Sequence, residues 1–360
     1  MKSLHLIMSL PARSDFLTAL VHSSAPSLHK LLSCGSARPP RDSLSGALCQ
    51  AFNIDKQMDW PLAPFCAQAD GLFNSDSHAD HWLRLDPVHF EISMGGLMLH
   101  PPAALDLSWA AAQTFINAIN LHWQNGDPHT EGWQIVATAP TRWYLRLPAK
   151  TKAAFELHTT PLDQMQAEYV TPHLPQGGSA RSMLKQINEA QMLLHAHPLN
   201  QQRENEGRIT VNGLWLWGGG TMPTTPLLPT QQPDQVAGNL FELHALAQQR
   251  DCPLLHPASA LADFSTQGHA LAVLTPDSSD LVAHLKQLEQ NWFKPLLRKL
   301  FWGKIKHVQL DWIGHHSVSL TPKQARLGLV RIDQYPAQIL TIWQSIWQSA
   351  RFQRQRDKEL

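Results

Sequence analysis

The sequence predicts an α/β protein in which a mixed or mostly parallel sheet is covered by helices. Two observations lead to this fold class. Segments with helical spacing alternate with short apolar runs along the 360 residues, and hydrophobic residues make up 43% of the chain. A chain of this length buries about three quarters of its unfolded surface, so one large core or two smaller cores are expected.

The first 200 residues alternate predicted helices and strands. Met1 to Leu10 is expected to be a buried strand rather than a signal peptide, because His5 interrupts its apolar run and no small-residue cleavage site follows. In order, we then expect helical pieces between loops over 11–80, including one over 46–52, two strands in 82–99 with a turn at Gly95-Gly96, a helix over 109–123, a strand pair at 133–137 and 143–147, and a helix over 179–197 that Ser179 caps and Pro198 ends.

The remaining elements begin with an almost continuously apolar strand over 211–217, typical of a strand covered on both faces. Further strands are expected at 271–274 and 306–312, and a helix at 280–301 contains Pro295. We expect the chain to divide into an N-terminal α/β part (1–222), a proline-rich loop (223–235), a C-terminal α/β part (236–335) and an amphipathic C-terminal helix (336–360).

Charge and cysteine content exclude several classes of protein. The 29 lysines and arginines equal the 29 acidic residues, and a basic stripe is evident only in the last ten residues, which disfavours a nucleic-acid binder. No run reaches the roughly 18 apolar residues of a membrane helix. Four scattered cysteines without a C-x-x-C pair argue against a zinc or disulfide framework. We therefore expect a cytoplasmic protein that binds neither nucleic acid nor membrane.

Two segments carry candidate ligand-binding residues. Gly218, Gly219 and Gly220 follow a predicted strand, where backbone N–H groups can converge on an anion; the alternative is a tight exit turn. On the helix over 179–197, Asn188 and His195 lie seven residues apart and share a polar face with Gln191. The alternative there is a helix end whose His197 bonds its own last carbonyls.

Two clusters have the residue types of metal sites. Asp311, His315 and His316 follow a predicted strand and are the better placed, whereas the cluster over 76–81 reads as a hydrated loop tip. For each of the two clusters, the alternative is that the side chains are simply hydrated and bind no metal.

Four phrases of the sequence together resemble a bacterial family of cofactor-independent phosphoglycerate mutase-like and RpfE-type regulatory proteins. They are Asp86-Pro87-Val88-His89, Pro140-x-Arg142-Trp143-Tyr144-Leu145-Arg146-Leu147, Asn188-Glu189-x-Gln191-Met192-Leu193-Leu194-His195-x-His197-Pro198-x-Asn200, and Val211-Asn212-x-Leu214-Trp215-Leu216-Trp217-Gly218-Gly219-Gly220. The last segment is similar to the Trp-Gly-x-Gly turn of the archaeal-type mutases. The resemblance extends over most of the chain and is weaker after Pro229.

The resemblance implies an alkaline-phosphatase-like α/β fold with two divalent metals, Mn²⁺ or Mg²⁺, and a serine nucleophile that carries the phosphoryl group. This sequence departs from that pattern. Asp70-Gly71 is isolated, no nucleophile motif is evident, and only Asp311, His315 and His316 are available as late metal ligands. We therefore expect a degenerate member of the fold, for which the sequence establishes no cofactor.

The leading functional hypothesis is a binding or regulatory protein for a small anionic or phosphorylated ligand, with Arg142 supplying the charge. The predicted pocket is lined by Asp86, His89, Arg142, Asn188, Gln191, His195, His197, Asn200 and Asn212, with Gly218, Gly219 and Gly220 as its floor. One alternative is an active metal-dependent mutase or phosphotransferase. Another is an interaction protein whose C-terminal helix docks a protein partner through Trp343 and Trp347.

Overall fold

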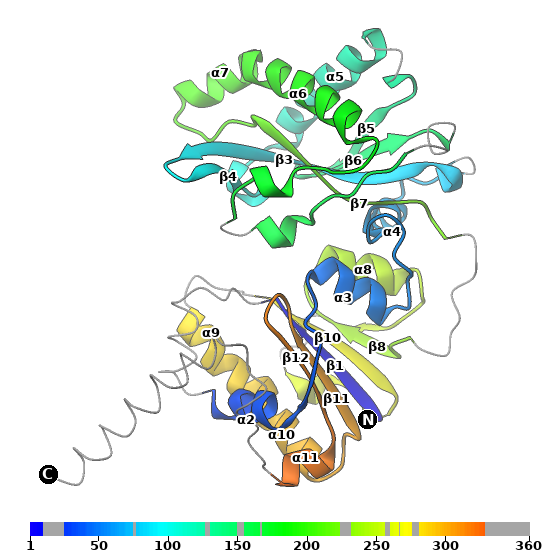
Figure 1. The fold of residues 1–360 in the computed structure, drawn as a ribbon, viewed down its shortest axis with the longest axis vertical. Coiled ribbons are helices and arrows are strands. Elements are labelled where there is room, and N and C mark those ends of the chain that lie inside the picture. Colours follow the sequence, from blue (N-terminus) through cyan, green and yellow to red (C-terminus); the bar gives the residue numbers. More distant parts are fainter. Residues whose placement is uncertain are drawn as a thin grey trace, which may run out of the picture. The chain divides into compact units, whose positions relative to one another are not determined.

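The computed structural model describes residues 1–9, 25–74, 77–126, 130–149, 155–165, 168–223, 232–255, 260–265, 267–275 and 281–327. The chain forms two compact units, each with its own sheet (Figure 1). Unit 1 comprises Met1–Ala47, Gln232–Leu240 and Cys252–Leu360, and unit 2 comprises Leu48–Gln231 and Phe241–Asp251. Helix α3 (Leu44–Ala51), close to the predicted helix over 46–52, spans the first boundary.

This division does not follow the one expected at the 223–235 loop. The first strand of the chain pairs with two strands from the last hundred residues, so both ends of the chain contribute to unit 1. Such pairing between distant segments leaves no local signal in the sequence. The predicted helix over 336–360 and the apolar residues around Phe16 lie outside the described residues.

Unit 1 contains a seven-stranded sheet in the order β2-β12-β11-β1-β10-β8-β9. Neighbours from β11 to β9 run parallel, and β12 and β2 add to the edge in antiparallel fashion. The mostly parallel α/β sheet predicted from the sequence is confirmed here. Its strands are β1 (Ser3–Met8), β2 (Ser36–Arg38), β8 (Gln235–Ala237), β9 (Leu254–Leu255), β10 (His269–Leu274), β11 (His307–Trp312) and β12 (His316–Leu320).

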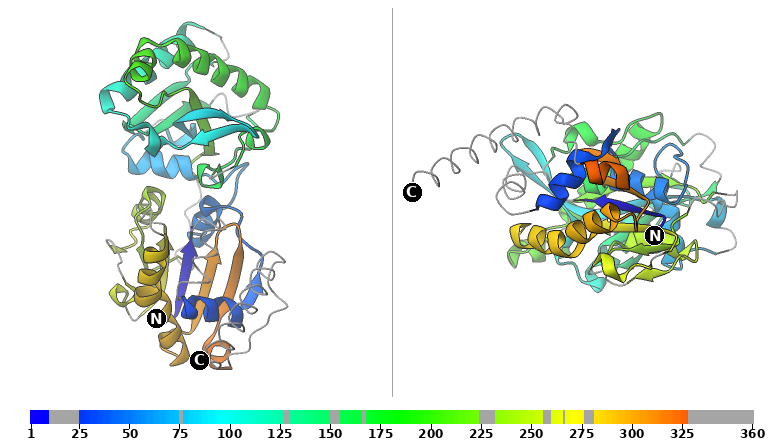
Figure 2. Two further views of the ribbon diagram at one scale, coloured as in Figure 1. Left: turned by 90° about the vertical axis from the view of Figure 1, so that its left-hand side faces the viewer. Right: turned by 90° about the horizontal axis from the view of Figure 1, so that it is seen from below.

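One face of this sheet is apolar and packs against four helices. Leu4 and Leu6 of β1 join a single core with Leu31, Leu285 and Leu296 of the helices. The helices are α2 (Pro26–Cys34), α9 (Leu281–Leu288), α10 (Lys294–Phe301) and α11 (Pro322–Leu327). Figure 2 shows α9 and α10 alongside the strands. The predicted helix over 280–301 is observed without a break as α9, a π-helical turn over Glu289–Phe293 and α10. The wider turn directly precedes the segment of Pro295, which lacks the N–H donor of a regular helix.

Unit 2 contains a five-stranded sheet whose strands are all antiparallel, which the sequence did not reveal. Strand β3 is central because it pairs with β4, β6 and β7. The strands are β3 (His81–Ser93), β4 (Gly96–His100), β5 (Gln134–Ala139), β6 (Arg142–Leu147) and β7 (Gly213–Gly220). The predicted hairpin at Gly95-Gly96 and the predicted pair of β5 and β6 are confirmed.

Helices cover both faces of the unit 2 sheet. Leu83 and Leu85 of β3 point to the face covered by α5 (Trp109–Asn125) and α6 (Ala180–Ala196). Trp82 points to the other face, where it packs with α4 (Leu62–Ala69) and α8 (Phe241–Gln248). Because successive side chains of a strand alternate between faces, the sheet separates the side chains of Arg84 and Asp86 from those of Leu83 and Leu85.

The start of α6 differs from its predicted form, and its end lies where it was predicted. The Ser179 hydroxyl does not cap the helix and instead accepts a hydrogen bond from the N–H of Glu156 at 3.1 Å. Pro198 ends α6 as predicted, and it also begins α7 (Pro198–Asn205). Nδ1 of His197 accepts from the N–H of Leu199 at 3.1 Å and caps α7, so His197 does not bond its own helix carbonyls through the ring. No helix among the described residues is long and apolar enough to span a membrane.

Candidate functional site

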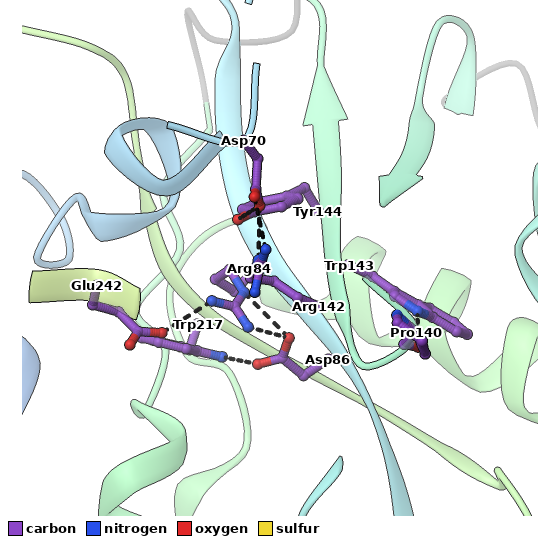
Figure 3. Close-up of polar contacts among 9 residues, drawn as sticks. All are labelled: Asp70, Arg84, Asp86, Pro140, Arg142, Trp143, Tyr144, Trp217 and Glu242. Atoms are coloured by element: carbon purple, nitrogen blue, oxygen red, sulfur yellow. Dashed lines mark hydrogen bonds and ion pairs between the residues drawn. The ribbon is translucent and has the colours of Figure 1, made fainter. Parts of the chain in front are cut away.

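A buried ion pair lies on the unit 2 sheet face that α4 and α8 cover (Figure 3). Nη2 and Nε of Arg84 donate to Oδ1 of Asp86 at 2.7 and 3.2 Å, and Nη1 donates to Glu242 at 3.1 Å. The indole N–H of Trp217 donates to Oδ2 of Asp86 at 2.7 Å. Arg84 and Asp86 lie two residues apart on β3, so they share one face of the strand. Both oxygens of Asp86 are therefore bonded inside the core.

Aromatic rings enclose the Arg84 guanidinium from two neighbouring strands. Its central carbon lies 5.4 Å from the ring of Tyr144 on β6 and 5.0 Å from the ring of Trp217 on β7. A cation over an aromatic face in a desolvated site is stabilised by the ring quadrupole. These rings occupy the space a ligand would need to reach Arg84, so its position favours a structural role.

A second ion pair lies nearer the surface on the same sheet face. Nε and Nη2 of Arg142, the first residue of β6, donate to the two oxygens of Asp70 at 2.7 Å each. Asp70 directly follows α4, and the Tyr144 hydroxyl donates to it at 2.6 Å. The Arg142 guanidinium carbon also lies 3.7 Å from the ring centroid of Phe241, at the start of α8. Three elements, β6, the end of α4 and the start of α8, therefore fix the orientation of one guanidinium.

Hydrogen bonds set the protonation of this second pair. Burial acts to raise the pKa of Asp70, but hydrogen bonds from Arg142, Tyr144 and Thr138 outweigh it and lower that pKa. Burial acts to lower the pKa of Arg142, and its bonds to Asp70 raise it instead. Both groups are thus held in their charged forms.

Around Arg84, burial has a larger effect on the pKa values than hydrogen bonding does, because the side chains are more deeply buried. Burial raises the pKa of Asp86, and the guanidinium of Arg84 and the indole N–H of Trp217 oppose this rise. Burial also raises the pKa of the Tyr144 phenol and of the Cys66 thiol, so both are uncharged at neutral pH. The two groups provide neither a nucleophilic thiolate nor a phenolate.

The predicted pocket is not assembled as one cavity, since its residues lie on both faces of the sheet. Asn188, Gln191 and His195 lie on α6, which packs against the face opposite to that of Asp86. Arg142 belongs to the Asp86 face, as its hydrogen bond to Asp70 beside α4 shows. Figure 3 shows the same separation, with the neighbouring residue Trp143 turned away from the ion pairs toward Pro140.

The glycines are also distant from the end of α6. The Asn200 side chain bonds the carbonyls of Leu194 and Val211 at 2.7 and 2.8 Å, which joins the last turn of α6 to the residues that precede β7. Gly219 lies eight residues beyond Val211 in the chain. Eight residues of extended chain span roughly 26 Å. His195 and Gly219 therefore do not line a common cavity, and the idea of a single site around both is wrong.

Several other predicted ligand residues make structural hydrogen bonds. The Asn212 side chain bonds both backbone groups of Phe90, accepting at 2.6 Å and donating at 3.0 Å, and thereby extends the ladder between β3 and β7. Nδ1 of His89 donates to the carbonyl of Thr210 at 2.9 Å. Asn200, described above, is buried. These side chains connect strands and turns.

The three glycines are buried and form the last part of β7 rather than a loop. Gly220 lies so close to Pro61 that a Cβ would come within 2.4 Å of the proline Cβ, and Gly218 has a φ of +68°, which favours glycine. Glycine at these positions lets the segment before α4 approach the sheet. The close approach of this segment accounts for the glycines, and the tight exit turn given as the alternative is not formed, because they belong to the strand.

The residues predicted to bind a metal do not form a ligand set. Across the β11–β12 pair, Asp311 lies opposite Ser317 whereas Trp312 lies opposite His316, so Asp311 and His316 point to different faces. Oδ2 of Asp311 instead accepts from Nε2 of His5 at 2.7 Å and from Gln309 at 2.8 Å. Among the residues with a described placement, no three His, Cys, Asp or Glu side chains could hold one metal ion. The residues therefore do not fit the implied metals.

Sequence reasoning did not connect Asp70, Arg84 and Glu242 with this site. One signal was available, since Arg84 and Asp86 stand two residues apart in an apolar strand, and Arg142 and Arg146 stand four apart in another, so each pair shares one face. Charges at alternate positions of an otherwise apolar strand indicate partners on one buried face. Glu242, the second partner of Arg84, is 158 residues away from it in the chain, so this pattern could not identify it.

The fold and site together define a two-unit α/β protein with a mostly parallel sheet in one unit and a buried arginine–carboxylate network on the antiparallel sheet of the other. No protein-family model matches the chain.

Part of the chain is homologous to cofactor-independent phosphoglycerate mutases. It is 27% identical over 145 residues to a probable 2,3-bisphosphoglycerate-independent phosphoglycerate mutase of Geobacter sulfurreducens, which is 40% of this chain and 34% of that protein. Over 67 residues it is 34% identical to the corresponding mutase of Methanothrix thermoacetophila, 19% of this chain and 17% of the relative. These alignments span about a third or less of each relative.

A solved cofactor-independent phosphoglycerate mutase from Thermoplasma acidophilum superimposes with a TM-score of 0.43 and 16% identity, over 89% of this chain and 90% of that one. The sequence likeness to the mutases is therefore confined to part of this chain. Its alkaline-phosphatase-like topology stays a prediction.

Proposed function

We propose that this protein binds a small anionic or phosphorylated ligand through Arg142 and does not carry out two-metal phosphoryl transfer. The observation that carries the proposal is the orientation of the Arg142 guanidinium. A guanidinium has five N–H groups. Asp70 accepts two of them, and Nη1 has no hydrogen-bond partner among the described residues. The side chain is 24% exposed, so this remaining edge can reach solvent.

Arg142 suits this role better than Arg84 does. Each nitrogen of Arg84 already donates to Asp86 or Glu242, and the residue is buried. Since Asp70 neutralises much of the Arg142 charge, we expect recognition to depend on the direction of the free N–H groups and the affinity to be modest. A planar fork of this kind suits phosphate or carboxylate oxygens.

The absence of two-metal transfer is supported by the sequence and by the placement of Asp311. The sequence has no evident nucleophile motif of the mutase pattern. Asp311 is engaged with His5 and Gln309, and His316 points to the other sheet face. A regulatory role of the RpfE type and a cytoplasmic location belong to the same proposal.

The experiment is a thermal-shift titration with 3-phosphoglycerate, 2-phosphoglycerate and inorganic phosphate on the wild type and on Arg142→Lys. We expect at least one of these probes to raise Tm in the wild type and the shift to disappear in the variant, because lysine keeps the charge and loses the fork. Arg146→Lys is the matched control. Arg146 lies on the same strand, is bound by Asp80 at 2.6 Å and is similarly exposed. Equal shifts in both variants would contradict binding at Arg142.

The homology to the mutases favours one other candidate, an active metal-dependent phosphoglycerate mutase. It predicts interconversion of 2- and 3-phosphoglycerate with Mn²⁺ or Mg²⁺ that a chelator abolishes. Such activity would contradict our proposal that the protein does not carry out phosphoryl transfer. The proposed binding of a ligand by Arg142 is tested separately, by the thermal-shift titration.

A further inference from the structure

A basic patch surrounds the turn between α10 and β11 in unit 1. It consists of Arg298, Lys304, Lys306 and Arg326, all of which are exposed. Nε of Arg326 on α11 donates to the carbonyl of Phe301 at 2.7 Å, which places α11 against the end of α10. The N–H of Lys304 donates to the carbonyl of Lys299 at 2.9 Å, so the turn folds back on the helix. The cations are therefore neighbours in space.

Few acidic residues accompany these cations. Residues 294–327 contain seven lysines and arginines and a single acidic residue, Asp311, which is buried and bonded to His5. In the described part of the chain, no carboxylate forms an ion pair with any of the four residues of the basic patch. The patch thus presents positive charge that the described protein does not neutralise, although the net charge of the chain is zero.

Three large apolar side chains lie among the cations. Trp302 is 71% exposed, Leu327 57% and Phe301 39%. The rings of Phe301 and Trp302 meet edge to face with their centroids 5.6 Å apart. A single exposed apolar residue is ordinary on a protein surface, but a group that combines aromatic and aliphatic side chains with unpaired cations marks an interaction surface.

We propose that the basic patch with Phe301, Trp302 and Leu327 is a docking surface for an anionic phospholipid membrane. Lysine and arginine are attracted to acidic headgroups, and tryptophan is favoured at the level where headgroups meet acyl chains. Binding to single-stranded nucleic acid would use flat rings for base stacking. Leu327 cannot stack in this way, whereas a lipid interface accommodates it together with both rings.

The proposed mode of binding is peripheral. No described helix is long and apolar enough to span a bilayer, so the three apolar side chains would enter only the interfacial layer. This surface departs from the expectation of no membrane partner, which rested on the charge balance of the whole chain.

The test is co-sedimentation of the full chain with phosphatidylcholine vesicles and with vesicles that also contain about a third phosphatidylserine. We expect binding to the anionic vesicles, weaker binding in added salt, and little binding to the neutral ones. The double variant Lys304→Ser/Lys306→Ser should bind the anionic vesicles about 25-fold more weakly, since each cation contributes about fivefold near such a surface. Arg181→Ser/Lys185→Ser, on exposed positions of α6 in unit 2, removes the same charge and should bind as the wild type does.

The apolar contribution is tested separately. Trp302→Ser should weaken anionic-vesicle binding severalfold, whereas Met192→Ser, at a position 73% exposed on α6, should not. Unchanged vesicle binding by Lys304→Ser/Lys306→Ser would overturn the proposal, as would equal binding to neutral vesicles. So would tighter binding to a single-stranded oligonucleotide that this double variant loses, because the patch would then be a nucleic-acid surface.

Discussion

The cations on the unit 2 sheet and those in the basic patch of unit 1 differ in their pairing with carboxylates. On the unit 2 sheet, Arg84, Arg142 and Arg146 each bond a carboxylate. In the basic patch of unit 1, the described residues provide no carboxylate for Arg298, Lys304, Lys306 or Arg326. The comparison teaches that the pairing of a charge, rather than its number, separates framework residues from residues available to a partner. An arginine whose donors are all taken holds strands together, and an unpaired lysine can bind something outside the chain.

The largest expected effect comes from breaking the buried pair. Arg84→Met should destabilise unit 2 by about 3–5 kcal/mol, because the carboxylate of Asp86 stays buried without a cation and the half-buried Glu242 also loses its partner. Urea denaturation, with hydrogen exchange of the β3 and β7 amides to assign the loss to unit 2, measures it. Adding Asp86→Leu should restore much of the stability. A loss below 1 kcal/mol for Arg84→Met would show that the pair is not a framework element.

Asp311 extends the comparison to unit 1, because it is the single acidic residue within residues 294–327, where the basic patch lies. Burial acts to raise its pKa, but hydrogen bonds from His5 and Gln309 lower the pKa of Asp311 to about 2. A lowered pKa stabilises the fold above the ordinary value near 4, and that contribution, about 2 kcal/mol, is lost as the pH falls toward 2. Unit 1 of Asp311→Asn should be less stable at pH 7 and should change less between pH 4 and pH 2. Equal acid profiles for the two proteins would contradict this.

Asp70→Asn tests whether Arg142 needs its ion pair with Asp70 in order to bind a ligand. We expect a loss of about 1.5 kcal/mol in unit 2, since two charge-assisted hydrogen bonds to Arg142 are weakened. The lowered pKa of Asp70 means that this stabilisation is present at neutral pH and is lost on acidification. The Tm shift caused by phosphorylated probes should also shrink. Asp80→Asn, which loosens Arg146, should preserve that shift.

The smallest expected effect is on the stability of the basic patch variant. Lys304→Ser/Lys306→Ser should change the free energy of unfolding by less than about 0.5 kcal/mol, because exposed side chains without partners contribute little to folding. Denaturation midpoints of wild type and variant should coincide. A loss above 1 kcal/mol would mean that these lysines have a structural role, and the contrast between the units would weaken.

Local elements could be predicted where the signal lies within a few residues. The helix predicted over 109–123 is α5, where Ser108 accepts from the N–H of Ala111 and buried residues recur at helical spacing. The hairpin at Gly95-Gly96 was predictable from its two glycines. The mostly parallel sheet followed from the alternation of element types, and β1 was recognised from its apolar run.

The candidate site could not be assembled in the same way. The sequence identified Asp86, Arg142 and Asn212, but not which face of the sheet each occupies, and the proposed pocket combined residues from both faces. Register and strand order decide this, and both depend on contacts between distant segments. The basic patch could not be predicted for a related reason. Its cations are spread over residues 298–326, and the net charge of zero for the whole chain arises from acidic residues elsewhere.

The position of β1 between β10 and β11 has a consequence for biosynthesis. Ser3 pairs with His269 on one side and with His307 on the other, so β1 is synthesised 266 residues before one of these partners and 304 residues before the other. Unit 2 is drawn mostly from one uninterrupted stretch, Leu48–Gln231, and its last segment, Phe241–Asp251, is synthesised before either neighbour of β1. We expect the apolar side chains of β1 to stay without their native partners for most of translation, so that slowed synthesis of the last hundred residues should favour aggregation.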